Sequence, residues 1–339
     1  MNFLVIRLSA LGDVAMAIPA IYSVAQAYPE HTLTVVTSTF IARLFIGVPS
    51  NVRLMSVERG DISGVTGTWR MLRRLANEDV DAVADLHNVL RTWIIDAYFH
   101  ILRKPVVMVD KMRGERGAIL RQHAITSQPF VLRYFDVFAR IGLPTSSRFT
   151  SLFPQKLPAL PCGIPVKNGI RWIGIAPFAR YRSKTLDEDC AVKLLNILAR
   201  QDGTKVFLFG AQGKEAKMLC AWAKGKKHIM VVAGQLHLEE ELALMSHLDV
   251  MLTMDSANMH LASLVGTRVV SVWGGTTPAC GFLGYGQDLS DAVLADLPCQ
   301  PCSIAGSDKC PLGHMNCVKM LNIEEIADRL LTDKTQTKI

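Results

Sequence analysis

Short apolar runs rich in valine and isoleucine alternate along the chain with stretches whose apolar residues recur at helical spacing. A short apolar run without polar alternation is typical of a strand buried on both faces, as in parallel sheets covered by helices. The pattern therefore predicts an α/β protein, with helices between the strands. The expected strands are Phe3 to Arg7, Thr32 to Thr37, Val52 to Val57, Ala82 to Leu86, Val106 to Val109, Trp172 to Ala176, Lys205 to Phe209, Met230 to Val232, Val250 to Met254 and Val269 to Trp273.

A change of composition divides the chain near its middle. Four prolines lie between Pro154 and Pro165, and proline continues neither a helix nor a central strand. Because 339 residues also exceed what one hydrophobic core usually organises, two domains are expected, at 1–160 and 161–339. Each has the strand and helix alternation of a Rossmann-like, doubly wound sheet. Such sheets bind ligands at the carboxyl ends of their strands, so a binding site is expected in a cleft between two facing sheets.

The chain is expected neither to cross a membrane nor to begin with a secretion signal. No apolar run approaches the roughly 18 to 20 residues that span a bilayer. The stretch from Met1 to Ala20 is apolar, but it contains Arg7 and Asp13, and the apolar region of a signal peptide carries no charges.

The net charge of +7 lies entirely in the first half of the chain. Residues 1–168 hold 19 Lys and Arg against 12 Asp and Glu, whereas residues 169–339 hold 18 of each. From Arg91 to Arg148 the count is 10 basic against 4 acidic residues. This balance favours an anionic ligand, nucleic acid or an acidic membrane surface, with a solvated basic face as the alternative.

Asp13 is the first candidate for chemistry. It follows the first expected strand, and Gly12 is expected to allow a tight turn into a helix from Asp13 to Ala27. A carboxylate at a helix N-terminus stays ionised at neutral pH and is suited to accept a proton from a substrate hydroxyl. Aspartate is also a favoured N-cap, so the position by itself leaves a structural role open.

The segment Thr253-Met254-Asp255-Ser256-Ala257-Asn258-Met259-His260 follows another expected strand and opens a helix. The N–H groups of a first helical turn make an anion site suited to a diphosphate. Ser256 adds a hydroxyl, and His260 returns to the same helix face four residues later. A packed histidine is the alternative for His260.

Two loops at the same expected sheet edge complete this second candidate site. Lys184, in the basic loop from Pro177, is a point charge for phosphate, although an ordinary exposed basic loop is the alternative. In the other loop, Gly274 permits a close backbone approach to a ligand and Thr276 follows it.

The sequence contains no GxGxxG, GxxxxGK[ST] or GxSxG motif, so dinucleotide binding, P-loop hydrolysis and α/β-hydrolase chemistry lose support. Asp79 and Asp81 have the spacing of a metal-binding pair, but they precede a strand and are expected at the wrong edge.

Four cysteines crowd into a segment near residues 299–317, namely Cys299, Cys302, Cys310 and Cys317. Four thiolates can close a tetrahedral Zn²⁺ site, which would be structural because no coordination position stays open. The gaps of seven and six residues are not those of a standard zinc finger, so disulfides or free thiols are the alternative. A chain of this length with eight cysteines is not a secreted disulfide scaffold, and a reducing compartment is expected.

The chain resembles glycosyltransferase family 9, the lipopolysaccharide heptosyltransferases. The resemblance rests on the segment from Ile6 to Asp13, on Asp85-Leu86-His87-Asn88, on Lys184, and on Asp255-Ser256 followed by His260-Leu261-Ala262. It implies a GT-B architecture, with the acceptor on the first domain and an ADP-sugar on the second. It also implies inverting transfer without a catalytic metal or other cofactor.

Carried over residue by residue, the resemblance makes Asp13 the base that deprotonates the acceptor hydroxyl. Lys184, Asp255, Ser256, His260, Gly274 and Thr276 match the donor-binding segments. The sequence departs from the family pattern at two positions: Ala257 stands where many members have glycine, and Leu186 stands where tryptophan often follows the lysine. Similar cysteine clusters in the family favour a structural role for the four cysteines.

An acceptor that bears carboxylates and phosphates would dock on the basic first domain, and an acceptor anchored by lipid A would bring the enzyme to the inner face of the inner membrane. The candidate acceptor residues are Arg7, His87, Asn88, Arg91, Lys111, Arg113 and Arg116. The expected enzyme is thus cytoplasmic and peripheral, moving heptose from ADP-heptose to inner-core lipopolysaccharide. One alternative is a transferase of the same fold with another nucleotide-sugar donor. The other is a non-enzymatic nucleic-acid binder, which is disfavoured because the charge does not coincide with the cysteines.

Overall fold

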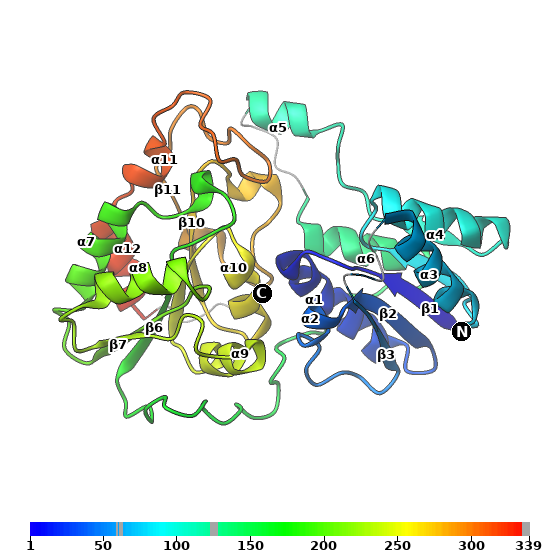
Figure 1. Cartoon of the computed structure of the whole chain (residues 1–339), viewed down its shortest axis with the longest axis horizontal. Helices are drawn as coiled ribbons and strands as arrows, with labels where there is room; N and C mark the ends of the chain where they lie inside the picture. Colours follow the sequence, from blue (N-terminus) through cyan, green and yellow to red (C-terminus); the bar gives the residue numbers. More distant parts are fainter. Residues whose placement is uncertain (59, 61–63, 123–127, 334–339) are drawn as a thin grey trace. The chain divides into compact units, whose positions relative to one another are not determined.

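The structure, a computed structural model, describes residues 1–58, 60, 64–122 and 128–333. The chain forms two compact units, the first from Met1–Arg113 and Gln128–Thr150, and the second from Gly114–Ser127 and Ser151–Ile339. Each unit contains one parallel β-sheet with helices on both faces (Figure 1). The predicted α/β class is therefore confirmed.

The sheet of the first unit has five strands in the order β3-β2-β1-β4-β5. The strands are β1 (Asn2–Ile6), β2 (Thr32–Ser38), β3 (Val52–Val57), β4 (Ala82–Asp85) and β5 (Val106–Met108). The helices are α1 (Leu11–Ala27), α2 (Thr39–Ala42), α3 (Gly64–Ala76), α4 (Leu90–Ile101) and α6 (Phe130–Arg140). Because β1 pairs with both β2 and β4, the strand order reverses beside β1, where open α/β sheets bind their ligands.

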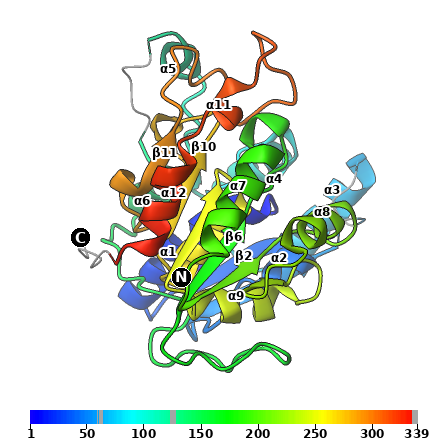
Figure 2. The same ribbon diagram turned by 90° about the vertical axis from the view of Figure 1, so that its left-hand side faces the viewer.

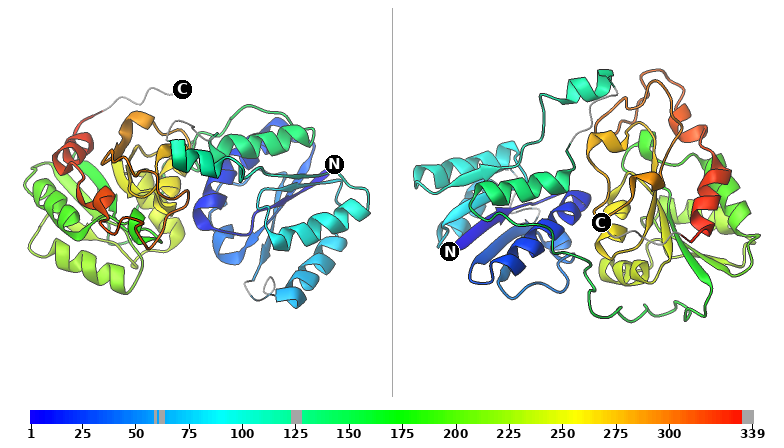
Figure 3. Two further views of the ribbon diagram at one scale, coloured as in Figure 1. Left: turned by 90° about the horizontal axis from the view of Figure 1, so that it is seen from above. Right: turned by 180° about the vertical axis from the view of Figure 1, so that it is seen from behind.

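Helices cover both faces of this sheet. On one face α3 and α4 bury Met71, Leu75, Ile95 and Phe99 against apolar side chains of the strands, and Figure 3 shows these two helices, in light blue and cyan, side by side. Helices α1 and α6 contact each other on the other face. Burial on both faces explains why β1 reads as one continuous apolar run.

The sheet of the second unit has six strands in the order β11-β10-β9-β6-β7-β8. The strands are β6 (Arg171–Ala176), β7 (Thr204–Leu208), β8 (Ile229–Val231), β9 (Val250–Met254), β10 (Val269–Trp273) and β11 (Ala292–Leu294). The helices are α5 (Arg116–Gln122), α7 (Glu188–Leu198), α8 (Lys214–Ala223), α9 (Leu238–Ser246), α10 (Ala257–Leu264), α11 (Asn316–Lys319) and α12 (Ile323–Leu331). Short 3₁₀ turns occur at Arg182–Lys184, Pro278–Cys280 and Leu289–Asp291.

The core of the second unit lies between this sheet and α7, α8 and α12. Leu194, Leu198, Trp222, Ile326 and Leu330 pack there against the strands, and Figure 2 shows α7 and α12 next to each other over the sheet. Helices α9 and α10, which contact each other, belong to the opposite face. The central strands β6, β9 and β10 thus end in loops whose positions a rigid core holds.

The predicted strands correspond to observed ones within a residue or two, and Val52–Val57, Val250–Met254 and Val269–Trp273 agree at both ends. The sequence reading missed β11, whose three residues are too few to show a periodicity. It was also wrong about Gly12, because α1 begins at Leu11 and Gly12 lies in its first turn without a positive φ.

None of the helices in the described ranges is long and apolar enough to span a bilayer.

Candidate functional site

The first group of predicted site residues lies at the carboxyl ends of β1, β4 and β5. Arg7 follows β1, His87 and Asn88 follow β4, and Lys111 follows β5. Parallel pairing of β1 with β4 and of β4 with β5 brings these ends to one edge of the sheet. Asp13, in the first turn of α1, lies at the same edge.

Arg7 holds the Asp13 carboxylate. Its Nη2 lies 2.5 Å from Oδ2 of Asp13, and its Nη1 donates to the Leu86 carbonyl at 2.6 Å. The Ala10 N–H also donates to Oδ2 of Asp13, at 3.3 Å. Oδ1 of Asp13 has no hydrogen-bond partner among the described residues, and the side chain is one-third exposed. One carboxylate oxygen is therefore fixed while the other is free to accept a proton.

Asp13 is not the N-cap of α1, as the structural alternative had supposed. The N-cap of α1 is Ala10, and Asp13 is the third residue of the helix. Its bond back to the Ala10 N–H satisfies one of the donors that a helix start leaves open. Asp13 thus stabilises the helix start without using its second oxygen.

The pKa values of His87 and Lys111, two basic side chains at this edge, are both lowered. Burial, together with the charges of Arg7 and Lys111, lowers the pKa of His87 to about 3, and burial together with Arg7 lowers the pKa of Lys111 to about 8. The Leu8 N–H points at Nδ1 of His87 over 3.4 Å, so the neutral ring carries its proton on Nε2. The neutral imidazole is thus a hydrogen-bond donor.

A buried pair of carboxyl groups anchors the loop that carries His87 and Asn88. Asp85 is fully buried, and its Oδ1 accepts from the N–H groups of His87 at 2.7 Å and Asn88 at 2.9 Å. The Thr92 hydroxyl donates to Oδ2 of Asp85 at 2.6 Å. Asp96 of α4 lies against Asp85; burial and that neighbouring carboxyl raise the pKa of Asp96 to about 8. Neither carboxyl oxygen of Asp96 has a hydrogen-bond partner within the described ranges, and the raised pKa keeps this buried carboxyl group neutral at pH 7. Sequence reasoning missed Asp96, whose position in a helix gave no signal.

The remaining acceptor candidates divide between the two units. Arg113 donates to the Asn88 carbonyl at 3.2 Å and lies over the ring of Trp93, whose indole N–H donates to Oδ1 of Asn88. The charge of Arg91 contributes to the lowered pKa of His87. Arg116 begins α5 in the second unit. Arg91 and Arg113 thus belong to the unit that carries Asp13, whereas Arg116 belongs to the other unit.

The second group of predicted site residues lies at the carboxyl ends of β6, β9 and β10. Nζ of Lys184 lies 2.9 Å from Oδ2 of Asp255, and both side chains are largely buried. The Thr276 hydroxyl donates to the same oxygen at 2.7 Å, and Thr276 is fully buried. An ammonium has three N–H donors; besides Asp255, Lys184 reaches only the Ala305 carbonyl, at 3.4 Å, among the described residues. One donor of Lys184 thus remains for a ligand.

Ser256 is the N-cap of α10, and its Oγ is buried without a hydrogen-bond partner in the described part of the chain. The first-turn N–H groups of a helix have no partner within the helix. Together they form a set of donors next to the Lys184–Asp255 pair, suited to an anion. His260 is buried one turn further along α10.

Gly274 allows a close approach to another loop. A Cβ atom at Gly274 would lie 2.1 Å from the carbonyl oxygen of Ser183, and the N–H of Gly275 donates to that oxygen at 2.7 Å. The close contact expected between this glycine and a ligand is thus, in the structure, a contact with the Lys184 loop. Leu186 is buried in the core of the second unit, so its departure from the family pattern concerns packing.

The cysteine-rich segment holds the Lys184 loop in position. The Ser183 N–H donates to the Ser307 carbonyl at 3.1 Å, and the Ser307 N–H donates to Oγ of Ser183 at 2.9 Å. The N–H of Arg182 donates to Oδ1 of Asp308 at 3.1 Å. The side-chain amide of Gln300 bonds the Gly274 carbonyl at 2.6 Å. Sequence reasoning missed these polar residues because it interpreted the segment only through its cysteines.

The four cysteines of this segment are free thiols. Burial and the other three thiols raise the pKa of Cys317 to about 11. Hydrogen bonds from backbone N–H groups, chiefly that of Met315, lower the pKa of Cys310. The thiols therefore influence one another. In the ranges that the structure describes, no group of three or more His, Cys, Asp or Glu side chains is placed to hold a metal ion.

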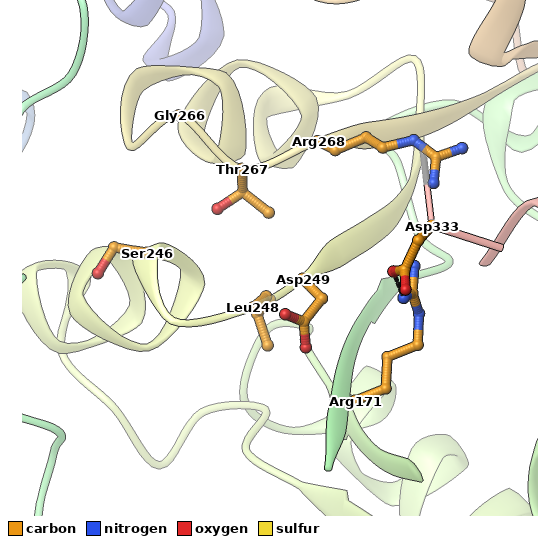
Figure 4. Close-up of a pocket in the computed structure, with 8 residues that line it drawn as sticks. All are labelled: Arg171, Ser246, Leu248, Asp249, Gly266, Thr267, Arg268 and Asp333. Carbon is orange, nitrogen blue, oxygen red and sulfur yellow. Dashed lines mark hydrogen bonds and ion pairs between the residues drawn. The ribbon is translucent and has the colours of Figure 1, made fainter. Parts of the chain in front are cut away.

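A pocket of about 310 Å³ in the second unit lies away from these groups (Figure 4). Of its lining residues, Arg171, Asp249 and Arg268 lie at or next to the starts of β6, β9 and β10, while Ser246 ends α9 and Asp333 follows α12. Arg171 is paired with Asp333, and Arg268 with Asp291. The pocket is therefore at the edge opposite the strands' carboxyl ends, and its cations already have acidic partners.

Asp81 is likewise at the amino edge of the first sheet, where it accepts from the Asn2 N–H at 2.8 Å.

The family model described as glycosyltransferase family 9 (heptosyltransferase) matches residues 68–311. Lipopolysaccharide core heptosyltransferase OpsX of Haemophilus influenzae is 22% identical over 279 residues, which cover 79% of this chain and 78% of the relative. Lipooligosaccharide heptosyltransferase 2 of Campylobacter jejuni is 24% identical over 328 residues, or 94% of each chain.

Among solved structures, the chain is similar to the E. coli heptosyltransferase WaaC with ADP. The TM-score is 0.64 at 19% identity, and the match covers 85% of this chain and 92% of that one. The two parallel sheets thus correspond to the GT-B fold of that enzyme.

Proposed function

Because the chain belongs to glycosyltransferase family 9, we propose that it transfers heptose from ADP-heptose to an inner-core lipopolysaccharide acceptor. The observation that carries the proposal is the Asp13 carboxylate, with one oxygen held by Arg7 and the other free. Two relatives named as heptosyltransferases and a related structure with ADP support the sugar and the nucleotide.

In the proposed reaction, Oδ1 of Asp13 takes the proton of the acceptor hydroxyl as that oxygen attacks the anomeric carbon of heptose. The bond from this carbon to the diphosphate oxygen breaks, and ADP departs with the electron pair. A single displacement inverts the anomeric configuration. The proton remains on Asp13 until it passes to solvent, which its partial exposure permits.

The negative charge that develops on ADP is met by groups of the second unit. Lys184 supplies the remaining N–H donor of its ammonium, while Ser256 and the first turn of α10 supply neutral donors. These groups are already in position before the charge develops, which is the condition for effective electrostatic stabilisation. Asp255 and Thr276 act through Lys184 by fixing its position. No step of the proposed reaction uses a metal ion.

The acceptor is proposed to bind the first unit, and the nucleotide-sugar the second. Arg91, Lys111 and Arg113 supply positive charge for phosphates and carboxylates, and neutral His87 donates its Nε2 proton. Because the proposed acceptor is lipid-linked, the enzyme is proposed to work in the cytoplasm against the inner face of the inner membrane.

We also propose that Zn²⁺ can bind the four clustered cysteines as a structural ion. The clustering of Cys299, Cys302, Cys310 and Cys317 within one segment supports a shared site. Their side chains must rearrange to become ligands. Metal analysis of protein purified without chelators measures the zinc content per chain. Matched Cys310→Ser and Ala305→Ser variants separate the thiols from the segment as a whole. Zinc at the same level in both variants would refute the assignment.

A thermal-shift panel with ADP, UDP, GDP and a short oligonucleotide tests the proposed donor. A ligand that binds only the folded state at 100 times its Kd stabilises it by about 2.7 kcal/mol, which raises the unfolding midpoint measurably. Stabilisation by ADP alone is the expected result, followed by transfer from ADP-heptose. Stabilisation by UDP or GDP instead would favour another nucleotide-sugar donor, and a response to the oligonucleotide alone would contradict the enzyme proposal.

A further inference from the structure

Helix α4 exposes a stripe of apolar residues and buries two polar ones, Thr92 and Asp96. Leu90, Trp93, Ile94 and Ile101 are 74%, 41%, 47% and 80% exposed. With exposed Ala97 they recur at the three- and four-residue spacing that forms one face of a helix. Helices at a protein surface normally turn such a stripe toward the core. We name this stripe the α4 face.

Interactions within the first unit account for the inverted orientation of α4. Thr92 and Asp96 are both buried on the side of Asp85, which anchors the His87 loop: the Thr92 hydroxyl donates to Asp85, and Asp96 lies against the same carboxylate. Ile95 and Phe99 fill the remaining core positions beneath the sheet. With these four residues directed inward, the helical period directs the α4 face outward. Its exposure is therefore a consequence of the site's construction.

The charges around the α4 face are positive. Residues 90–104 contain three cations, Arg91, Arg103 and Lys104, and the buried Asp96 as their only acid. No acidic side chain pairs with any of these cations in the ranges described. Arg113 adds a further cation over the ring of Trp93, at 5.7 Å. The adjacent helix α3 carries the exposed Trp69, with Arg73 over its ring.

We propose that the α4 face docks the enzyme on an anionic phospholipid surface. An apolar helical stripe with flanking cations lies in the interfacial plane of a bilayer, where tryptophan side chains are also favoured. The inference rests on the proposed function in one respect, because a lipid-linked acceptor requires the enzyme to reach a membrane. The face begins next to Asn88, so docking brings the acceptor edge of the first unit to the lipid headgroups.

A second copy of the chain is a poorer occupant of the α4 face. In a symmetric dimer the same patch meets itself, so the cations beside the stripe would oppose one another. An anionic bilayer instead supplies acyl chains for the stripe and negative headgroups for the cations. Charge thus distinguishes the two occupants.

Flotation with vesicles tests the proposal on the whole protein. Vesicles of phosphatidylethanolamine and phosphatidylglycerol are expected to bind the protein, and vesicles of phosphatidylcholine much less. The triple variant Leu90→Gln, Ile94→Gln, Ile101→Gln is expected to bind at least about tenfold more weakly, because each buried methylene contributes to interfacial binding. The matched control is Leu289→Gln, Leu312→Gln, Met320→Gln, whose side chains are about as exposed but lie in the second unit. Equal binding by the two triple variants would overturn the proposal.

The cations are tested separately with Arg103→Gln and Lys104→Gln. Removing one cation near an anionic surface costs about 1 kcal/mol, so about fivefold weaker binding is expected for each substitution. Binding by the unmodified protein is also expected to fall with salt, because the Debye length shortens from ~10 Å at 0.1 M to ~3 Å at 1 M. Binding that is insensitive to both changes would contradict an anionic lipid surface.

Two further measurements keep this proposal distinct from the proposed function. Brominated lipids are expected to quench tryptophan fluorescence of the unmodified protein, since Trp69 and Trp93 are the exposed tryptophans; lack of quenching would count against docking. ADP binding and transfer to a water-soluble acceptor are expected to be unchanged in the α4-face variant. Vesicle binding without transfer would leave the docking face standing while the proposed reaction fails. A dimer that the α4-face variant dissociates, with no vesicle binding, would replace the lipid by a second copy.

Discussion

Arg7 and Asp13 form an ion pair that uses only one oxygen of the carboxylate. Nη2 of Arg7 lies 2.5 Å from Oδ2 of Asp13, and the same arginine is tied to the Leu86 carbonyl after β4. The pair therefore links the helix start after β1 to the loop that carries His87. This link orients the second oxygen of Asp13 without occupying it.

The variant Asp13→Asn is expected to lose transfer while it retains the nucleotide. General-base catalysis contributes typically 10²- to 10⁴-fold, so kcat should fall by about that factor. Asparagine keeps the shape of the side chain but cannot take the proton. Initial rates with ADP-heptose, together with ADP titration by calorimetry, measure both effects. A near-normal kcat would remove Asp13 from the mechanism.

The Lys184–Asp255 pair is expected to show strong coupling. The variant Lys184→Gln leaves a buried carboxylate without its cation, which should lower the free energy of unfolding by about 3 kcal/mol. The double variant Lys184→Gln, Asp255→Asn should recover much of that loss, because no unpaired charge remains. Urea unfolding of the two single variants and the double variant gives the coupling energy. Additive effects would show that the pair contributes little.

The same variants separate structural from donor roles. ADP affinity should fall about 10- to 100-fold in Lys184→Gln, as expected for one lost hydrogen bond to a charged group, and should stay low in the double variant. Recovery of ADP affinity together with stability would mean that Lys184 serves the fold alone.

The variant Ser256→Ala is expected to weaken ADP binding without destabilising the protein. In the described part of the chain the Ser256 hydroxyl is buried and unbonded, so its removal leaves no partner unsatisfied. The unfolding midpoint should stay equal or rise slightly, while the Kd for ADP rises about tenfold. Ser263→Ala is the control, since that hydroxyl donates to the Met259 carbonyl within α10. A lowered midpoint with unchanged ADP affinity would reverse the assignment.

The variant Asp96→Asn is expected to remove a pH dependence of stability. Folding raises the pKa of Asp96 from its ordinary value of 3.8 to about 8, so the folded state holds this proton more tightly than the unfolded state does. The stabilisation from Asp96 is thus complete below pH 4 and is lost progressively as the pH rises to 8. Asparagine keeps a donor toward Asp85 and never ionises.

We expect Asp96→Asn to match the unmodified protein near pH 4 and to be more stable near pH 8, by roughly 1 to 3 kcal/mol. Urea unfolding across this range measures the difference. Asp96→Ala, which removes the donor as well, should be less stable than Asp96→Asn at every pH. Parallel stability curves for the unmodified protein and Asp96→Asn would show that Asp96 is ionised in the folded state.

Several features of the site follow from local sequence pattern. The strands β3, β9 and β10 agree with the prediction at both ends, since a buried parallel strand needs a continuous apolar run. Lys184 and Asp255 were both expected at the carboxyl edge of the second sheet. In a parallel sheet all strands end at the same edge. A residue that follows a predicted strand in the sequence can therefore be assigned to that edge from the sequence alone.

Only the tertiary structure decided which residues pair across long sequence separations. The bonds from Arg7 to Leu86, from Lys184 to Asp255 and from Ser183 to Ser307 depend on strand order and loop paths. Periodicity carries no information about these contacts. The raised pKa of Asp96 beside Asp85 likewise depends on burial, which a helical position does not reveal.

The sequence by itself determined the α/β class, the strands and the residue types available for chemistry, because apolar period and chain direction are local properties. Which oxygen of Asp13 is free, which residues hold Lys184, and which face of α4 meets solvent were decided only when the chain folded. Each of these depends on the competition among distant groups for a limited number of hydrogen-bond and packing positions.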